Sequence, residues 1–292
     1  MEKEITRETQ REHCKRMYKG YSITMTTKIK NNPLVWFFLL TFIFSWFSGF
    51  PAALFPEKYG GLAFLSDFGP ALAAFMVAGV VEGSDGIKSL LRSLFQWRVK
   101  WVWYLIVLFG PTITMTVAIL LYTIWNRSFS LQGIETSLTL FPQHALTLVL
   151  VSLFLFVSIW GEEIGWRGFA LPKLQGEYHP IWASLILGAI WAVWHLPLFF
   201  TEGSVHAQMG FPFFFLATLG YSILYSWIYN GTGESVFMMC MLHAVNNATV
   251  TYTSLFFEPV ITEPIFALSV LVLFDVLVIL LSKSTLLYQK GV

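Results

Sequence analysis

Eight apolar segments, each about as long as a membrane-spanning helix, follow one another along this chain and constrain its fold most strongly. A helix of about 20 apolar residues crosses a bilayer. These runs are roughly twice as long as a tilted barrel strand and lack the two-residue alternation of a barrel. The sequence therefore predicts an all-α, polytopic membrane bundle of about eight helices. The segments are 34–54, 62–81, 101–125, 145–160 and beyond, 181–200, 211–229, 235–257 and 264–281.

Composition leaves little room for anything besides these spans. Only 12% of the 292 residues are charged, against about 25% in soluble domains. Eight spans use roughly 160 residues, so we expect a basic tail over 1–33 and a single transmembrane domain over 34–292. The lead before the first span is too long and polar for an ordinary cleaved signal peptide. We therefore expect the first span to be retained.

Basic residues fall almost entirely in alternate connections. Of the 18 Lys and Arg residues, Lys58 and Arg127 lie on one side of the predicted bundle and the other sixteen on the opposite side. Because basic loops remain in the cytosol, both termini are expected to be cytosolic. Membrane lipids are the expected partners of the spans, and the stretch 83–100 suits either an amphipathic surface helix or an ordinary charged loop.

A first group of polar residues runs from Trp160 to Arg167, out of the fourth span. On a helix, Glu163 and Arg167 are four residues apart and can pair, which leaves Glu162 on another face. Glu162, an unpaired carboxylate next to the paired Glu163, suits the role of a general base. Two acids and an arginine that simply mark the cytosolic end of a helix are an equally good interpretation of this group alone.

Two further groups lie in later spans. His195 stands near the far end of the fifth span, although a lone membrane histidine is more often a structural hydrogen-bonding group. His243 and Asn247 share one face of the seventh span, with Asn246 beside them. Two such donors can stabilise an oxyanion, or they can join neighbouring helices.

The three groups can converge if the fourth helix is longer than its apolar run. Glu162 and His195 flank the turn signal at 176–180 at nearly equal separation, roughly 20 to 24 Å along each helix. They face each other if the fourth helix continues to about Leu174. His243 lies about 15 Å into its span from the turn at 230–233, which brings it near the same level.

Together the groups resemble the type II CAAX prenyl protease family. The motifs are EExxxR at Glu162–Arg167, an aromatic residue followed by xxxHis at Trp191–His195, and HxxxN at His243–Asn247, in this order within 160–247. This family, also called CPBP, includes the Ras-converting enzymes and bacterial relatives linked to bacteriocin immunity. Trp191 is a departure, because the family usually has Phe at that position.

The resemblance implies a glutamate-dependent intramembrane endopeptidase. Glu162 would activate a water molecule with help from His195, while His243 and Asn247 would stabilise the tetrahedral oxyanion. The expected partner is a peptide or protein substrate that reaches the site from the membrane or the cytosolic side. Prenylated or C-terminal CAAX-like substrates are candidates, and no nucleic acid is expected. The resemblance also implies a multi-pass protein of the bacterial plasma membrane.

By the same resemblance, Glu163 and Arg167 would be structural or would position the substrate, and no cofactor would be needed. A divalent metal such as zinc remains the alternative, because two His and two Glu can bind zinc. HExxH, the sequence pattern of many zinc proteases, is absent.

Two other functions remain open. A proton- or ion-coupled transporter could use Glu162 and Glu163 as an ion site, and the repeated Phe-Gly-Pro at 68–70 and 109–111 suits the broken helices of transporters. A non-catalytic membrane immunity or scaffold protein could keep the polar groups for packing alone.

Overall fold

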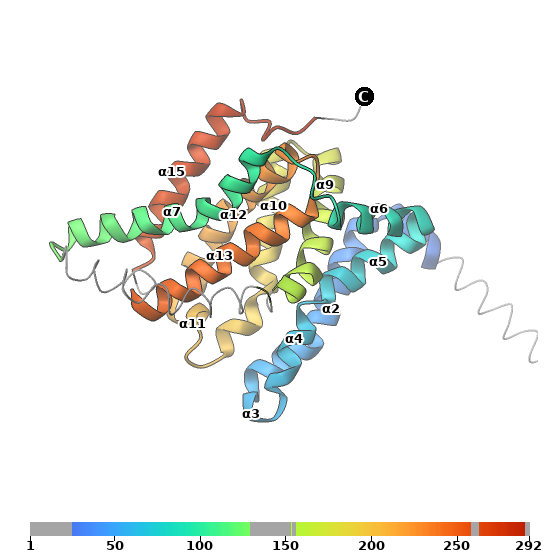
Figure 1. The fold of residues 1–292 in the computed structure, drawn as a ribbon. Helices are drawn as coiled ribbons and strands as arrows, with labels where there is room; N and C mark the ends of the chain where they lie inside the picture. Colours follow the sequence, from blue (N-terminus) through green and yellow to red (C-terminus); the bar gives the residue numbers. More distant parts are fainter. Residues whose placement is uncertain (1–24, 129–152, 154–155, 258–262, 290–292) are drawn as a thin grey trace, which may run out of the picture.

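A computed structural model describes residues 25–128, 153, 156–257 and 263–289. Within these residues the chain is helical, without strands, and the helices pack into one bundle (Figure 1). The all-α membrane bundle is thus confirmed. The elements are α2 (Pro33–Leu54), α3 (Pro56–Tyr59), η1 (Gly60–Leu62), α4 (Ala63–Ser66), α5 (Gly69–Val81), α6 (Ser84–Leu94), α7 (Trp101–Trp125), helical residues 156–163, η2 (Ile164–Ala170), α9 (Leu171–Glu177), α10 (Pro180–Trp194), η3 (Leu196–Phe200), α11 (Val205–Met209), α12 (Phe211–Gly231), α13 (Val236–Phe256) and α15 (Ile265–Leu281).

Five helical stretches in the described part of the chain are long and apolar enough to cross a membrane. α15 is apolar but has only 17 residues, and most of the predicted fourth span before residue 156 lies outside the described residues. The number of eight spans, the tail boundary and the placement of the termini therefore stay predictions. The five stretches are Pro33–Leu54, Pro56–Val81, Trp101–Trp125, Pro180–Phe200 and Phe211–Gly231.

The second of these stretches is a broken helix. α4 ends at Ser66, and α5 begins with Pro70 in its first turn, where the missing N–H of proline costs no helical hydrogen bond. The Ser45 hydroxyl of α2 donates to the Ser66 carbonyl at 2.7 Å and so satisfies a carbonyl at the break. The other Phe-Gly-Pro lies inside α7, which continues through Pro111. The two sequence matches therefore do not have the same structure.

The fourth predicted helix is longer than its apolar run, as expected. Residues 156–163 continue without interruption into η2 and α9, and the helix ends at Glu177. η2 is a π-helix, a rare widened turn. Two glycines bring this helix against the broken helix. A Cβ at Gly161 would lie 2.5 Å from the Asp67 carbonyl oxygen, and one at Gly165 would lie 2.7 Å from the carbonyl oxygen of Pro70.

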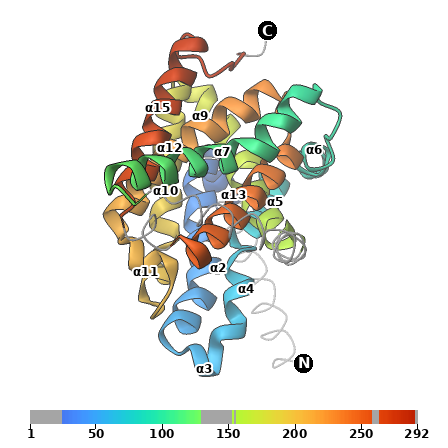
Figure 2. The same ribbon diagram turned by 60° about the vertical axis from the view of Figure 1, so that its left-hand side comes forward.

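The two ends of the bundle carry different loops. At one end, the Ser235 hydroxyl donates to the Gln96 carbonyl at 2.5 Å, and Lys173 forms an ion pair with Glu82 at 2.8 Å. α3 and α11 lie at the other end, away from α9 (Figures 1 and 2). We call the first end the basic face and define it as 82–100, 171–179, 230–235 and 282–289. The opposite face is defined as 55–66 and 195–213.

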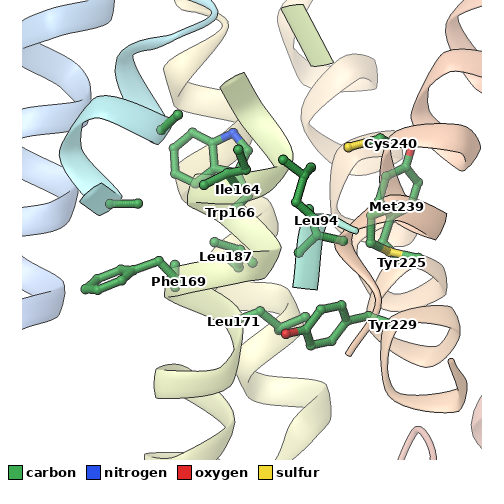
Figure 3. Packing of buried hydrophobic residues seen from close by; sticks show 14 of the residues in the cluster. Leu94, Ile164, Trp166, Phe169, Leu171, Leu187, Tyr225, Tyr229, Met239 and Cys240 are labelled. Atoms are coloured by element: carbon green, nitrogen blue, oxygen red, sulfur yellow. The ribbon is translucent and has the colours of Figure 1, made fainter. Parts of the chain in front are cut away.

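The main hydrophobic core fills the half of the bundle nearer the basic face. Leu171, Leu187 and Tyr229 are among the buried residues that meet there, from three separate helices (Figure 3). Of the two interpretations of the stretch 83–100, the helix is observed: it forms α6, which buries Leu90 and Leu94 against this core. Packing at this end therefore fixes the helices that carry the polar groups.

Candidate active site

The two adjacent glutamates lie at the junction of the helix 156–163 and η2. Glu162 is 7% exposed and Glu163 is fully buried. Consecutive residues of a helix point about 100° apart, so the two carboxylates have different surroundings. Because an isolated buried carboxylate is costly, each of them needs polar partners.

Glu163 is held between a cation and an imidazole. Its Oε1 accepts a hydrogen bond from Arg167 Nη1 at 2.9 Å and one from His243 Nδ1 at 2.8 Å. Arg167 is only 1% exposed and His243 only 4%. The predicted pair between Glu163 and Arg167 is present, and it is extended by the histidine of the third motif. His243 thus uses Nδ1 for Glu163, which leaves Nε2 as the ring nitrogen available to a ligand.

Arg167 is also enclosed by two aromatic rings. Its guanidinium carbon lies 4.3 Å from the centre of the Trp191 ring and 4.4 Å from that of the Tyr225 ring. A planar guanidinium between two rings combines cation–π attraction with an ion pair. The arrangement fixes the second motif against the first.

Trp191 also contacts the free carboxylate. Its Nε1 donates a hydrogen bond to Glu162 Oε2 at 3.2 Å. The same ring packs edge-on against His195 and His243, with centroids 5.6 Å away in both cases. Sequence reasoning noted Trp191 only as a departure from the usual Phe and missed this hydrogen bond.

His195 stands at the C-terminal end of α10. Its Nδ1 lies 2.8 Å from the Trp191 carbonyl oxygen. A carbonyl oxygen can only accept, so Nδ1 carries the proton and Nε2 of the neutral ring is an acceptor. The ring stacks on His206 of α11 with centroids 6.0 Å apart. Burial lowers the pKa of His206 to about 4, so this second ring is uncharged near neutral pH.

A cavity of about 750 Å³ connects these groups. Its walls include four of the six predicted site residues, Glu162, His195, His243 and Asn247, together with Asn246. Glu163 and Arg167 lie behind this wall, where they hold His243. The structure therefore brings the three predicted groups together at one level, and Glu162 is not left at a solvated helix end.

Asp67 is a further acidic residue of this cavity that sequence reasoning missed. It lies at the break between α4 and α5, next to the glycine that precedes Glu162. A signal was present, because Asp67 is a charged residue inside a predicted span. Among the described residues, no three His, Cys, Asp or Glu side chains are grouped closely enough to hold a metal ion.

Comparisons with known proteins agree with the motifs. A family model for type II CAAX prenyl endopeptidases of the Rce1-like type matches residues 143–249. The chain is also similar to CAAX prenyl protease 2 of Methanococcus maripaludis. The identity is 25% over 237 aligned residues, which cover 76% of this chain and 85% of the relative. The resemblance that the three motifs predict is thereby confirmed.

Proposed function

We propose that this chain, a relative of the type II CAAX prenyl endopeptidases, is an intramembrane endopeptidase in which Glu162 activates the attacking water. One observation carries the proposal. The buried Glu162 carboxylate is held by Trp191 in the wall of a cavity that His195, His243 and Asn247 also line. The similarity to proteases supports hydrolysis of a peptide bond.

Two acceptors on one side of the cavity suit a water molecule. Glu162 offers a carboxylate oxygen, and His195 offers Nε2, because its Nδ1–H is bound to the Trp191 carbonyl. Water that donates to both would direct its oxygen lone pair at a substrate carbonyl. A positioned base of this kind typically contributes about 10²- to 10⁴-fold to a rate.

Two donors on another element suit the oxyanion. Because His243 Nδ1–H is bound to Glu163, Nε2 can donate only when the ring is an imidazolium. The Glu163 carboxylate favours that charged form, while the Asn247 amide supplies a second donor that needs no proton. Such preorganised donors usually provide a large part of transition-state stabilisation.

The proposed reaction conserves protons without a further reagent. The water oxygen bonds to the carbonyl carbon as Glu162 takes one of its protons, and the carbonyl oxygen becomes an oxyanion. Protonated Glu162 then gives that proton to the amide nitrogen as the carbon–nitrogen bond breaks. The first products are a carboxylic acid and an amine, and Glu162 is again ionised. The proton of the acid then passes to the amine, which gives a carboxylate and an ammonium group.

The substrates we propose are peptides or proteins associated with the membrane. Much of the cavity wall is apolar, with Trp46, Leu198 and Phe214 among its residues, so an apolar flanking segment or lipid group would fit there. The named relative is a CAAX prenyl protease, which keeps prenylated or CAAX-like C-termini among the candidates. We propose no cofactor. Metal analysis of the purified protein tests this directly, because one zinc per chain lost together with activity on chelation would favour the zinc alternative.

The test compares peptide termini in cells that produce wild-type protein, Glu162→Gln or Glu177→Gln. Glu177 is an exposed acid at the end of the same helix and provides the matched control. We expect new peptide termini from membrane-associated proteins with wild type and Glu177→Gln, and their loss with Glu162→Gln. Identical termini in all three strains, at equal protein levels, would contradict the proposal.

A further inference from the structure

Asp67 is an acidic residue of the cavity wall that the proposed mechanism does not use. Among the described residues that line the cavity, only Asp67 and Glu162 are acidic, and none is Lys or Arg. We propose that Asp67 determines substrate specificity by accepting a hydrogen bond from a backbone N–H of the peptide, one or two residues from the scissile carbonyl. That the ligand is a peptide rests on the proposed function.

A break between two helices brings Asp67 against the helix that carries Glu162. α4 ends at Ser66 and α5 begins at Gly69, so Asp67 lies in the break itself. The backbone at the break touches the residue that precedes Glu162, because a Cβ at Gly161 would lie 2.5 Å from the Asp67 carbonyl oxygen. This contact holds Asp67 next to the proposed base.

Ser158 indicates how far the two carboxylates are apart. This buried serine lines the cavity and donates its hydroxyl hydrogen bond to the Asp67 carboxylate. Ser158 and Glu162 are four residues apart, so they share one face of their helix and are separated by one turn, about 5.4 Å along the axis. An extended peptide advances about 3.3 to 3.6 Å per residue. A substrate whose scissile carbonyl lies at Glu162 therefore brings an N–H one or two residues away to the level of Asp67.

The Asp67 carboxylate can accept a further hydrogen bond. An ionised carboxylate has about four lone-pair sites. Two hydroxyl groups use some of them, because Ser158 donates to the carboxylate and Ser66 Oγ lies 3.4 Å from its Oδ1. None of the ion pairs within the described part of the chain includes Asp67. The two hydroxyls therefore orient the carboxylate without saturating it.

A peptide in this cavity needs such an acceptor. Its backbone N–H groups lose their water on binding, and a buried N–H without an acceptor is costly. Glu162 and His195 are committed to the attacking water in the proposed mechanism. Ala63 and Ile159, wall residues from α4 and from the helix 156–163, have no side-chain acceptor. These apolar surroundings suit the membrane-associated substrates proposed above, whose backbone N–H is a donor that all of them carry.

Two substitutions of Asp67 separate its role as an acceptor from its charge. Asp67→Asn keeps an acceptor oxygen and Asp67→Leu removes it, while neither side chain is charged. With a fluorogenic peptide that spans a cleavage site found in the cellular comparison, we expect KM of Asp67→Leu to exceed that of Asp67→Asn by about tenfold at similar kcat. Asp85→Leu, at an exposed acid of α6, is the control and should keep the wild-type KM. Equal KM values for the two Asp67 variants would overturn the proposal.

A second measurement identifies the N–H group of the substrate. The same peptide is N-methylated in turn at each backbone nitrogen within two residues of the scissile bond, except at the scissile nitrogen. We expect one of these methyl groups to lower kcat/KM of wild type by about tenfold, but that of the smaller variant Asp67→Ala by less than about twofold. Equal losses in the two proteins at every position would refute the hydrogen bond. A lysine in the peptide that raised kcat/KM only in wild type would also overturn the proposal, because it would assign a basic side chain to Asp67.

Binding to inactive protein separates this proposal from the proposed chemistry. Dissociation constants of the parent and methylated peptides are measured for Glu162→Gln and for Glu162→Gln combined with Asp67→Ala. We expect Glu162→Gln to bind the critical methylated peptide about tenfold more weakly than the parent peptide, and the double variant to bind both alike. A Glu162→Gln protein that still cleaves the peptide would refute the proposed base, whereas a methylation effect on Kd that does not depend on Asp67 would refute the proposed acceptor.

Discussion

The indole of Trp191 contacts four polar groups that belong to all three motifs: Glu162, Arg167, His195 and His243. A phenylalanine could keep the ring contacts, but it could not donate to Glu162. The hydrogen bond holds the carboxylate in one rotamer at the cavity wall. Trp191 is therefore a positioning residue in the proposed mechanism.

Trp191→Phe removes the donor and keeps most of the ring. We expect kcat to fall about tenfold, in line with a lost hydrogen bond to a charged group, while KM and the melting temperature change little. Trp194→Phe is the matched control, since Trp194 lines the same cavity and its Nε1 has no hydrogen-bond partner in the described structure. Equal losses of kcat in the two variants would refute the specific role of the Trp191 N–H.

The buried ion pair between Glu163 and Arg167, behind the cavity wall, should contribute strongly to the unfolding free energy. Arg167→Met leaves Glu163 buried without its cation, and we expect a loss of about 3–5 kcal/mol in unfolding free energy. Thermal unfolding in detergent measures the effect. Lys173→Met is the control on the same helix, where a partly exposed pair with Glu82 should contribute no more than about 1 kcal/mol. Similar shifts for both variants would contradict the account.

At this scale the sequence predicted some of the contacts between the candidate site residues and not others. The spacing of Glu163 and Arg167 was enough to predict their pair, because four residues bring two side chains together on a helix. The bond from Glu163 to His243 joins residues 80 positions apart, and no local pattern indicates such a contact. The sequence shows Asp67 as a charged residue inside a predicted span. Its position in the cavity wall could not be predicted, because it depends on the break between α4 and α5.

The long helix 156–177 is the element on which the site depends. Its length was predictable, because Glu162 and His195 lie at nearly equal distances from the turn that joins their helices. The π-helical turn η2 was not predictable, because it comes from tertiary packing rather than from residue preference. Glycines at 161 and 165 gave no clear signal alone, and their role appears only against Asp67 and Pro70.

Gly165→Ala tests this packing. The added methyl group would meet the Pro70 backbone, so the two helices must separate, and we expect a loss of about 1–3 kcal/mol in unfolding free energy. Activity should fall as well, because the shift moves Glu162. Gly176→Ala, on the same helix but with open space around it, should be neutral or stabilising by up to about 1 kcal/mol. Thermal unfolding of both variants measures these changes. A Gly165→Ala protein as stable as wild type would contradict the close packing of the two helices.

For the whole molecule, the sequence predicted the helical membrane bundle from segment length and hydropathy. The exact spans were harder to predict, because α13 combines apolar residues with the polar residues of its motif and α15 is short. The position of the cavity was not predictable, since it depends on how the helix halves pack.

The orientation of the whole molecule can be measured with a fluorescent protein fused after Val292. The charge distribution places both termini in the cytosol, so a fusion that fluoresces only when it folds in the cytosol should be bright. A fusion of the same reporter after Phe55 should be dark. The reverse result would contradict the predicted topology.

The account depends most on Glu162 as the base. The direct measurement is kcat/KM of purified wild type, Glu162→Gln and Glu177→Gln on one peptide substrate identified from the cellular comparison. We expect Glu162→Gln to lose at least about 100-fold in kcat/KM at an unchanged melting temperature, while Glu177→Gln keeps wild-type activity. A folded Glu162→Gln protein that hydrolyses the peptide at the wild-type rate would contradict the mechanism.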